Sequence, residues 1–290
     1  MTLVHARSLM ERAILARSAT LAFNLVSLEM AEAIIQGAER AGTGVILQIS
    51  ENAIRFHGGR ATALLCACRE LAEQSTVPIA IHLDHVQDQQ IAREAMASAA
   101  RTGLTSIMID AAHLPYGENL VLTSSLTEEA HVAGLWVEAE LGAVGGKDGA
   151  HVSGVRTDPE EARAFVEFTR VDALAIAVGS SHAMTSRDAK LDNALIAQIR
   201  RGVAAPLVLH GSSGVSEEGV RQAIDAGIRK VNIGTALAVA FTAELRSFFE
   251  ADATTSDPRR YLALARDRVS AQVAQFCTLT TNGRPSTHTP

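Results

Sequence analysis

The chain has 290 residues, of which 47% are hydrophobic and only 4% aromatic, so its core must be built from Ala, Val, Ile and Leu. This composition is typical of a parallel sheet covered by Ala-rich helices. The net charge is −6, and no block of Lys or Arg interrupts the sequence, so a nucleic-acid-binding protein is not expected.

Neither membrane attachment nor a disulfide framework is expected. The first residues mix charges with short apolar runs, unlike a signal peptide, and the longest apolar run, 173–178, is too short to cross a bilayer. The three cysteines, Cys66, Cys68 and Cys277, form an odd set that does not indicate disulfide bonds, and we interpret them as small core residues. We therefore expect a cytoplasmic protein.

Strand and helix patterns alternate along almost the whole chain. Strands are predicted at 21–25, 45–49, 79–83, 104–109, 135–139, 173–178, 207–209 and 229–233. Helices are predicted at about 5–17, 28–41, 60–73, 87–101, 119–133, from 158 onward, and at 192–200, 216–226, 236–250 and 257–276. Eight strand–helix units predict an α/β fold, a single-domain (β/α)8 TIM barrel with extra terminal helices over residues 1–277. The polar tail 278–290 is expected to be disordered or loosely packed.

A polar residue stands at the carboxyl end of each predicted strand. These residues are Asn24, Ser50, the pair Asp84 and His85, Asp110, Glu140, His182, His210 and Asn232. In a barrel of parallel strands all of these ends meet at one face, which is where such enzymes carry their active sites. The sequence therefore predicts a catalytic centre there.

Three of these strand-end residues are histidines, which suits a zinc ion held by three imidazoles with one position open to substrate. A lone histidine at a strand end is more often a satisfied polar residue, but His85, His182 and His210 together favour a metal site. Asp84 would be a proton carrier or a support for the ligands. Asp110 and Glu140 would hold a second cation or act as hydrogen-bonding partners at the barrel mouth, and the spacing favours neither.

Two turns have the composition of anion-binding loops. Residues 211–214, with the sequence Gly-Ser-Ser-Gly, and residues 232–235, with the sequence Asn-Ile-Gly-Thr, follow the last two strands and precede helices. Loops at these places often bind phosphate in such barrels, so a phosphorylated substrate is the favoured interpretation.

Several motifs in order resemble the class II, zinc-dependent ketose-bisphosphate aldolases, which include the fructose- and tagatose-bisphosphate aldolases. The motifs are His82-Leu83-Asp84-His85, Ser106 to Asp110, Val137 to Gly142, Leu209 to Ser213 and Lys230 to Thr235. The resemblance runs from about residue 23 to residue 276. It implies an aldolase that cleaves a phosphorylated ketose to dihydroxyacetone phosphate and an aldehyde.

The resemblance also implies a role for each residue of the site. Zinc would be bound by His85, His182 and His210, and Asp84 would move the proton of the C4 hydroxyl. Asp110 and Glu140 match positions that hold a second divalent or monovalent cation. The substrate would contact Asn24, Ser50, Ala183, Gly211, Ser212, Ser213, Asn232, Ile233, Gly234 and Thr235. A homodimer or homotetramer is expected.

The sequence departs from the family pattern at three positions. Ala183 and Ser27 replace a usual Gly and Asn, and Asp148 stands where a Glu suspected of proton abstraction is common. Arg259 and Arg260 are weak candidates for binding a second phosphate.

Other roles are open or expected at the sequence level. We expect no Schiff-base lysine, because no Lys stands convincingly at a strand end facing the cavity, and we expect His82 to be structural and to point away from the site. Two alternatives stay open: a metal-dependent barrel hydrolase, and a non-catalytic barrel that serves as a binding or regulatory subunit.

Overall fold

The computed structural model describes residues 2–141, 156–180 and 188–280. Its strands are β1 (Thr20–Asn24), β2 (Val45–Ser50), β3 (Ile79–Val86), β4 (Ser106–Ile109), β5 (Trp136–Leu141), β6 (Ala173–Ile176), β7 (Leu207–Leu209) and β8 (Ile228–Ile233). They form a closed barrel in sequence order, and every neighbouring pair is parallel. The predicted (β/α)8 TIM barrel is confirmed.

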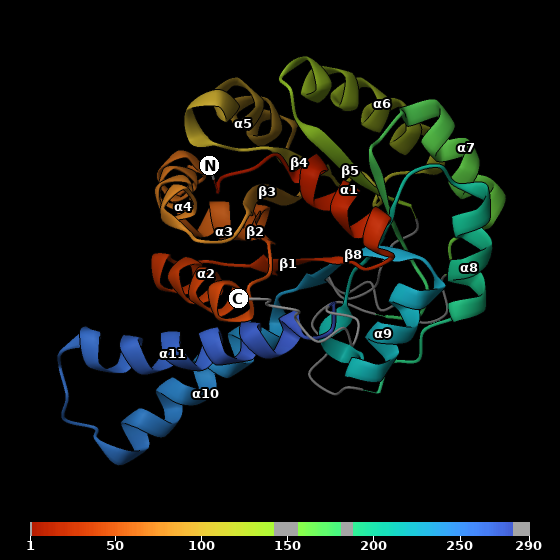
Figure 1. Cartoon of the computed structure of the whole chain (residues 1–290). Helices are drawn as coiled ribbons and strands as arrows, with labels where there is room; N and C mark the ends of the chain where they lie inside the picture. The colour runs from red at the N-terminus through yellow and green to blue at the C-terminus, as the bar shows by residue number, and fades with distance from the viewer. Residues whose placement is uncertain (1, 142–155, 181–187, 281–290) are drawn as a thin grey trace, which may run out of the picture.

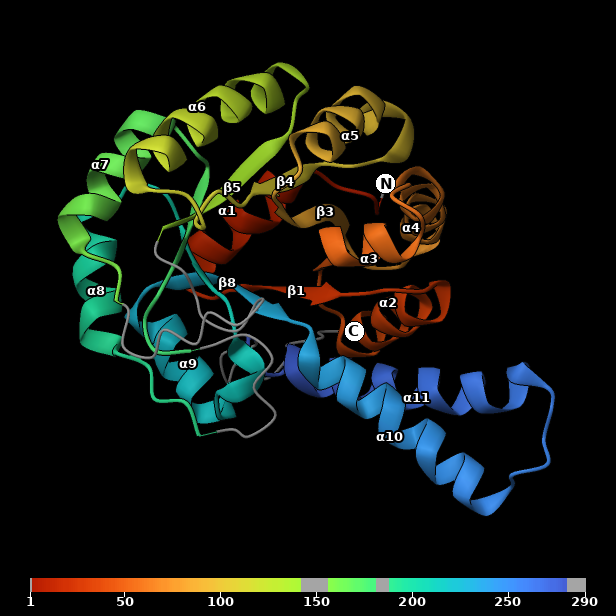
Figure 2. The ribbon, with the colours of Figure 1, turned by 180° about the vertical axis from the view of Figure 1, so that it is seen from behind.

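Helices surround the barrel and extend from it. They are α1 (Ala6–Ala16), α2 (Leu28–Ala41), α3 (Glu51–Phe56), α4 (Thr62–Gln74), α5 (Gln89–Thr102), α6 (Tyr116–Val132), α7 (Pro159–Thr169), α8 (Asn193–Gly202), α9 (Glu217–Ala226), α10 (Thr235–Ala251) and α11 (Pro258–Cys277). A short 3-10 helix, η1 (Ser212–Gly214), lies between β7 and α9. Figures 1 and 2 show α10 and α11 projecting from the barrel as a hairpin arm, with α11 passing beside α2.

The barrel interior has an apolar lower layer that α1 closes. Inward-facing side chains from six strands pack there on Ala6, Leu9 and Met10 of α1, which crosses the amino-terminal end of the barrel (Figure 1). The larger apolar cluster lies between the outward faces of the strands and the surrounding helices. Because α1 fills the lower end, the opposite end is left to carry the functional site (Figure 2).

The first residues of the predicted tail pack against the domain. Leu279 and Thr280 are buried just past α11, and the rest of the predicted tail lies outside the described residues, so the domain boundary at residue 277 stays a prediction.

Cys66, Cys68 and Cys277 are free thiols, and burial raises the pKa of Cys68 and of Cys277 to about 12. Among the described residues no helix is both long and apolar enough to cross a membrane.

Candidate active site at the carboxyl ends of the strands

Asp84, His85 and His210 meet at the mouth of the barrel, although β3 and β7 are far apart in the chain. All three are buried, and one potential ligand atom from each lies within 4.8 Å of the others. The rings of His85 and His210 have their centroids 4.7 Å apart, and Nε2 of His85 lies 3.9 Å from Oδ1 of Asp84. Two imidazoles and a carboxylate so close together can hold a divalent cation.

A left-handed residue makes this cluster possible. Neighbouring residues on a strand normally face opposite sides, which would send Asp84 and His85 in different directions. His85 instead has φ +51°, and the pairing of β3 with β4 shifts register between Leu83 and Val86. The left-handed turn of the backbone brings both side chains to the mouth. The strand itself continues to Val86, beyond the predicted end at residue 83.

The two histidines are held from behind by carboxylates. Nδ1 of His85 donates to Oδ2 of Asp110 at 2.8 Å, and Nδ1 of His210 donates to Oε2 of Glu140 at 2.9 Å. Of the two roles that the sequence left open for Asp110 and Glu140, the structure displays the hydrogen-bonding one. Such carboxylate–histidine pairs fix the orientation of metal-binding imidazoles.

His210 is held on both sides. Its Nε2 donates to Oε1 of Glu138 at 2.9 Å, deeper in the barrel. Burial alone would lower the pKa of His210, but the hydrogen bonds and charges of Glu138 and Glu140 outweigh it and raise this pKa to about 9. Without a metal ion, His210 is thus an imidazolium between two carboxylates.

Lys230 completes a buried polar layer beneath the cluster. Its Nζ donates to Glu138 at 2.7 Å, to Asn232 at 2.8 Å and to Gln48 at 3.0 Å, and the side chain is fully buried. Burial would raise the pKa of Glu138, but the charge of Lys230 and the hydrogen bond from His210 lower it to about 2.

Glu138, Gln48 and Lys230 are not among the residues that the sequence predicts for the site, although all three lie inside the barrel. The period of two along each strand could have found them, because each lies two residues before a predicted site residue: Glu140, Ser50 and Asn232.

Asp84 is held by amide groups. Nδ2 of Asn24 donates to its Oδ2 at 2.8 Å, and Nδ2 of Asn232 donates to its Oδ1 at 3.4 Å. Gln48 in turn donates to Oδ1 of Asn24 at 3.2 Å. Strands β1, β2 and β8 thus cooperate to fix a carboxylate carried by β3.

His82 points into the barrel, so its predicted direction is wrong, and its structural role stays a prediction. It lies two residues before Asp84 on β3, inside the barrel, and its Nδ1 is 2.9 Å from Oγ of Ser106. Burial, followed by the charge of Lys230, lowers the pKa of His82 to about 3. The period of two puts it on the same face as Asp84, so it is a neutral member of the polar layer.

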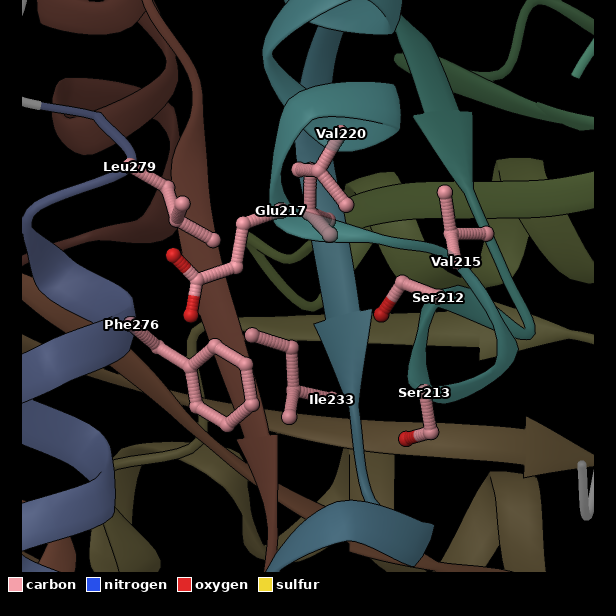
Figure 3. Close-up of a pocket in the computed structure, with 9 residues that line it drawn as sticks. Ser212, Ser213, Val215, Glu217, Val220, Ile233, Phe276 and Leu279 are labelled. Atoms are coloured by element: carbon pink, nitrogen blue, oxygen red, sulfur yellow. The ribbon is translucent and has the colours of Figure 1, made fainter. Parts of the chain in front are cut away.

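The two phosphate-type turns are tied to each other and to the site. Oγ of Ser212 donates to the carbonyl of Asn232, Oγ of Ser213 accepts from the backbone N–H of Ala236 at 3.1 Å, and Oγ of Ser180 donates to the carbonyl of His210 at 2.6 Å. Figure 3 shows both loop serines beside β8, among the residues that line a pocket whose apolar wall includes Ile233 and Phe276. These hydrogen bonds join the two turns to each other near the amino terminus of α10.

The remaining predicted residues differ in how they relate to this cluster. His182, Ala183 and Asp148 are outside the described residues. Ser50 ends β2 and caps α3, accepting from the N–H of Ala53. Arg259 and Arg260 begin α11 at the outer end of the arm (Figure 2) and pair with Asp257 and Asp252, so this chain does not bring them to its own site.

Comparison with known proteins decides the family. The model of the class-II fructose-bisphosphate aldolase family matches residues 4–283. The chain belongs to this family. It is therefore a lyase of the aldolase type, as predicted from its motifs.

Curated relatives and a solved structure cover nearly the whole aldolase chain. It is 38% identical to the fructose-bisphosphate aldolase of Geobacillus stearothermophilus over 94% of this chain and 95% of the relative. It is 39% identical to the probable fructose-bisphosphate aldolase of Bacillus subtilis (strain 168) over 87% and 88%. The crystal structure of the YdjI aldolase from Escherichia coli K12 superimposes with a TM-score of 0.81 at 29% identity, over 95% of this chain and 96% of that one.

Proposed function

We propose that this aldolase is zinc-dependent and reversibly cleaves a phosphorylated ketose, of the fructose- or tagatose-1,6-bisphosphate type, to dihydroxyacetone phosphate and an aldehyde. The observation that carries the proposal is the meeting of Asp84, His85 and His210 beside the tied turns of β7 and β8. The names of the curated relatives support the same substrate class. The family membership favours this function over the hydrolase and over the non-catalytic barrel.

The donor set fits zinc. His85 and His210, together with His182, which follows β6 in the sequence, would supply three imidazoles. Asp110 accepts from Nδ1 of His85 and Glu138 accepts from Nε2 of His210, so Nε2 of His85 and Nδ1 of His210 would bind the ion. Nδ1 of His210 would exchange its hydrogen bond to Glu140 for the metal. A bound zinc ion would supply Lewis acidity that stabilises the negative charge developing on the substrate oxygens. Asp110 and Glu140 stay candidates for a second divalent or monovalent cation.

Asp84 would move the proton. Cleavage of the C3–C4 bond requires the C4 hydroxyl to lose its proton, and the reverse reaction returns it. Asn24 and Asn232 donate to the two oxygens of the Asp84 carboxylate and so fix the orientation of the group that would accept this proton. Buried and held in this way, Asp84 meets substrate in one orientation.

The phosphate end would bind at the turns of Gly211 to Ser213 and of Asn232 to Thr235, with the backbone near Ala183. A side chain on Gly234 would place its Cβ 3.0 Å from Oδ1 of Asn24, so the chain approaches closely here. The N–H groups at the start of α10 favour an anion. Asn24 and Ser50 would contact the sugar. Asp148, a cytoplasmic location and assembly as a homodimer or homotetramer stay predictions.

The test is release of dihydroxyacetone phosphate from a panel of ketose phosphates by the purified chain. Activity should stop with a chelator and return with zinc. Release of inorganic phosphate alone would identify a hydrolase, and no turnover together with no zinc uptake would indicate a binding subunit.

A further inference from the structure

His85 has an unusual backbone for a residue within a strand. Three non-glycine residues of the described chain have positive φ: Arg17, His85 and Arg170. Arg17 and Arg170 are the C-caps of α1 and α7, where the left-handed conformation is common. His85, at φ +51°, lies inside β3, so its surroundings must hold it in a conformation that L residues rarely adopt.

The peptides that follow His85 are anchored by one buried carboxylate. Oε2 of Glu51 accepts from the backbone N–H groups of Gln87 at 2.7 Å and of Asp88 at 2.8 Å. The other oxygen, Oε1, accepts from Nε of Arg55 at 2.8 Å. Glu51 is 7% exposed, and its backbone begins α3, which lies beside β3 (Figure 2).

Strand β4 holds the same segment from the other side. The N–H of Asp110 donates to the carbonyl of Val86 at 3.0 Å, and Nε2 of Gln87 donates to Oδ2 of Asp110 at 3.3 Å. That carboxylate oxygen also accepts from Nδ1 of His85. The left-handed residue is therefore fixed at its ring by Asp110 and at its following backbone by Glu51.

We propose that Glu51 is a positioning residue for the metal site: by clamping the peptides of Gln87 and Asp88, it keeps His85 left-handed and its imidazole beside that of His210. Glu51 acts through the backbone of its neighbours. If the clamp is lost, β3 can relax toward ordinary alternation, which turns the ring of His85 out of the mouth. The inference rests on the proposed zinc-dependent function.

A matched clamp at the opposite end of β3 provides a control. Oε1 of Glu39, on α2, accepts from the N–H of Thr76 at 2.8 Å and from Oγ of Ser75 at 3.0 Å. Glu39 thus anchors the loop that leads into β3 at the amino-terminal end, away from the cluster. Its loss should affect stability without affecting the metal site.

The experiment compares Glu51→Ala and Glu39→Ala with the wild type in the full chain. Zinc affinity is measured by competition with a chromophoric chelator, together with thermal unfolding and turnover at limiting and saturating zinc. Glu51→Ala should weaken zinc binding about 10- to 100-fold, the range known for residues that orient metal ligands, and added zinc should restore its turnover. Glu39→Ala should keep zinc affinity within roughly twofold of the wild type, since it lies far from the ligands.

Equal zinc affinity in Glu51→Ala and wild type would overturn the inference while leaving the proposed function intact. An equal loss of zinc affinity in both variants would also overturn it, because the effect would then be general destabilisation. A wild type that takes up no zinc overturns the proposed function and the inference together. If Glu51→Ala does not fold, Glu51→Gln is used, in which the amide cannot satisfy both the backbone N–H groups and Arg55. Unchanged affinity there is equally decisive.

Discussion

The ammonium group of Lys230 lies 2.7 Å from Oε2 of Glu138, and both side chains are completely buried inside the barrel. Glu138 also accepts from His210, so this ion pair lies directly beneath the predicted metal ligands. A buried pair of this kind stabilises the fold only while both partners are present.

Replacing Lys230 by Met should therefore destabilise the protein strongly. Glu138 would keep its hydrogen bond from His210 but lose the cation that holds its pKa at about 2. We expect a loss of about 3–5 kcal/mol in the free energy of unfolding, measured with urea. The double variant Lys230→Met, Glu138→Gln removes both charges and should lose less than the two single variants combined. Additive losses would show that the pair is not coupled.

The stability of the metal-free protein should depend on pH through His82. Its pKa in the fold is about 3, below its ordinary value of 6.5, so the unfolded chain binds a proton that the folded chain excludes. The stabilisation is complete above pH 6.5 and is lost as the pH falls from 6.5 toward 3, by up to about 1.4 kcal/mol per unit. His210, with a pKa of about 9 in the fold, contributes with the opposite sign: its stabilisation is present below pH 6.5 and is lost as the pH rises from 6.5 toward 9.

Urea unfolding in the presence of chelator, at intervals from pH 6.5 to pH 5, measures this slope. His82→Gln removes the titrating group and should give a flatter profile over the same range. The same slope in the variant and the wild type would mean that His82 is not the group responsible.

The sequence predicted the strands well because each is a short buried apolar run between helices. It missed α3, since Glu51–Phe56 is only six residues long and follows β2 without an intervening turn. The predicted end of β3 is also too early. The sequence around His85 does not indicate that a left-handed residue lies inside the strand and that the strand continues past it.

The sequence predicts the site residues at the strand ends but not the buried polar residues beneath them. Polar residues that follow a strand stand out in the sequence. The buried layer is different, because its members lie within largely apolar strands, two residues before the strand-end residues: Gln48, Glu138 and Lys230. The partners of each histidine depend on which strands are neighbours and on their register. Residue types alone leave that choice open, as they did for Asp110 and Glu140.

Gly37 should not tolerate a side chain, because it marks the contact between α2 and α11. A Cβ there would lie 2.5 Å from the carbonyl oxygen of Ser270 and 2.6 Å from Cβ of Val273. Gly37→Ala should cost about 1–3 kcal/mol by overpacking, measured by urea unfolding. Gly117 in α6 has no atom within 4 Å of an added Cβ, so Gly117→Ala is the control and should be neutral or stabilising by up to about 1 kcal/mol. Equal effects at both positions would argue against the close approach of α11.

Replacing Asp84 and His210 in turn by Ala should separate the loss of turnover from the loss of zinc binding. Asp84→Ala removes the proposed proton carrier but leaves the imidazoles of His85 and His210, whose carboxylate partners are Asp110, Glu140 and Glu138. It should keep zinc affinity within about tenfold of the wild type and lose turnover by at least about 100-fold, as expected for a proton-transfer group. His210→Ala removes a ligand and should lose both zinc and turnover. Metal analysis of the purified variants and dihydroxyacetone phosphate release make the comparison, and near-normal cleavage by Asp84→Ala would assign the proton transfer to another residue.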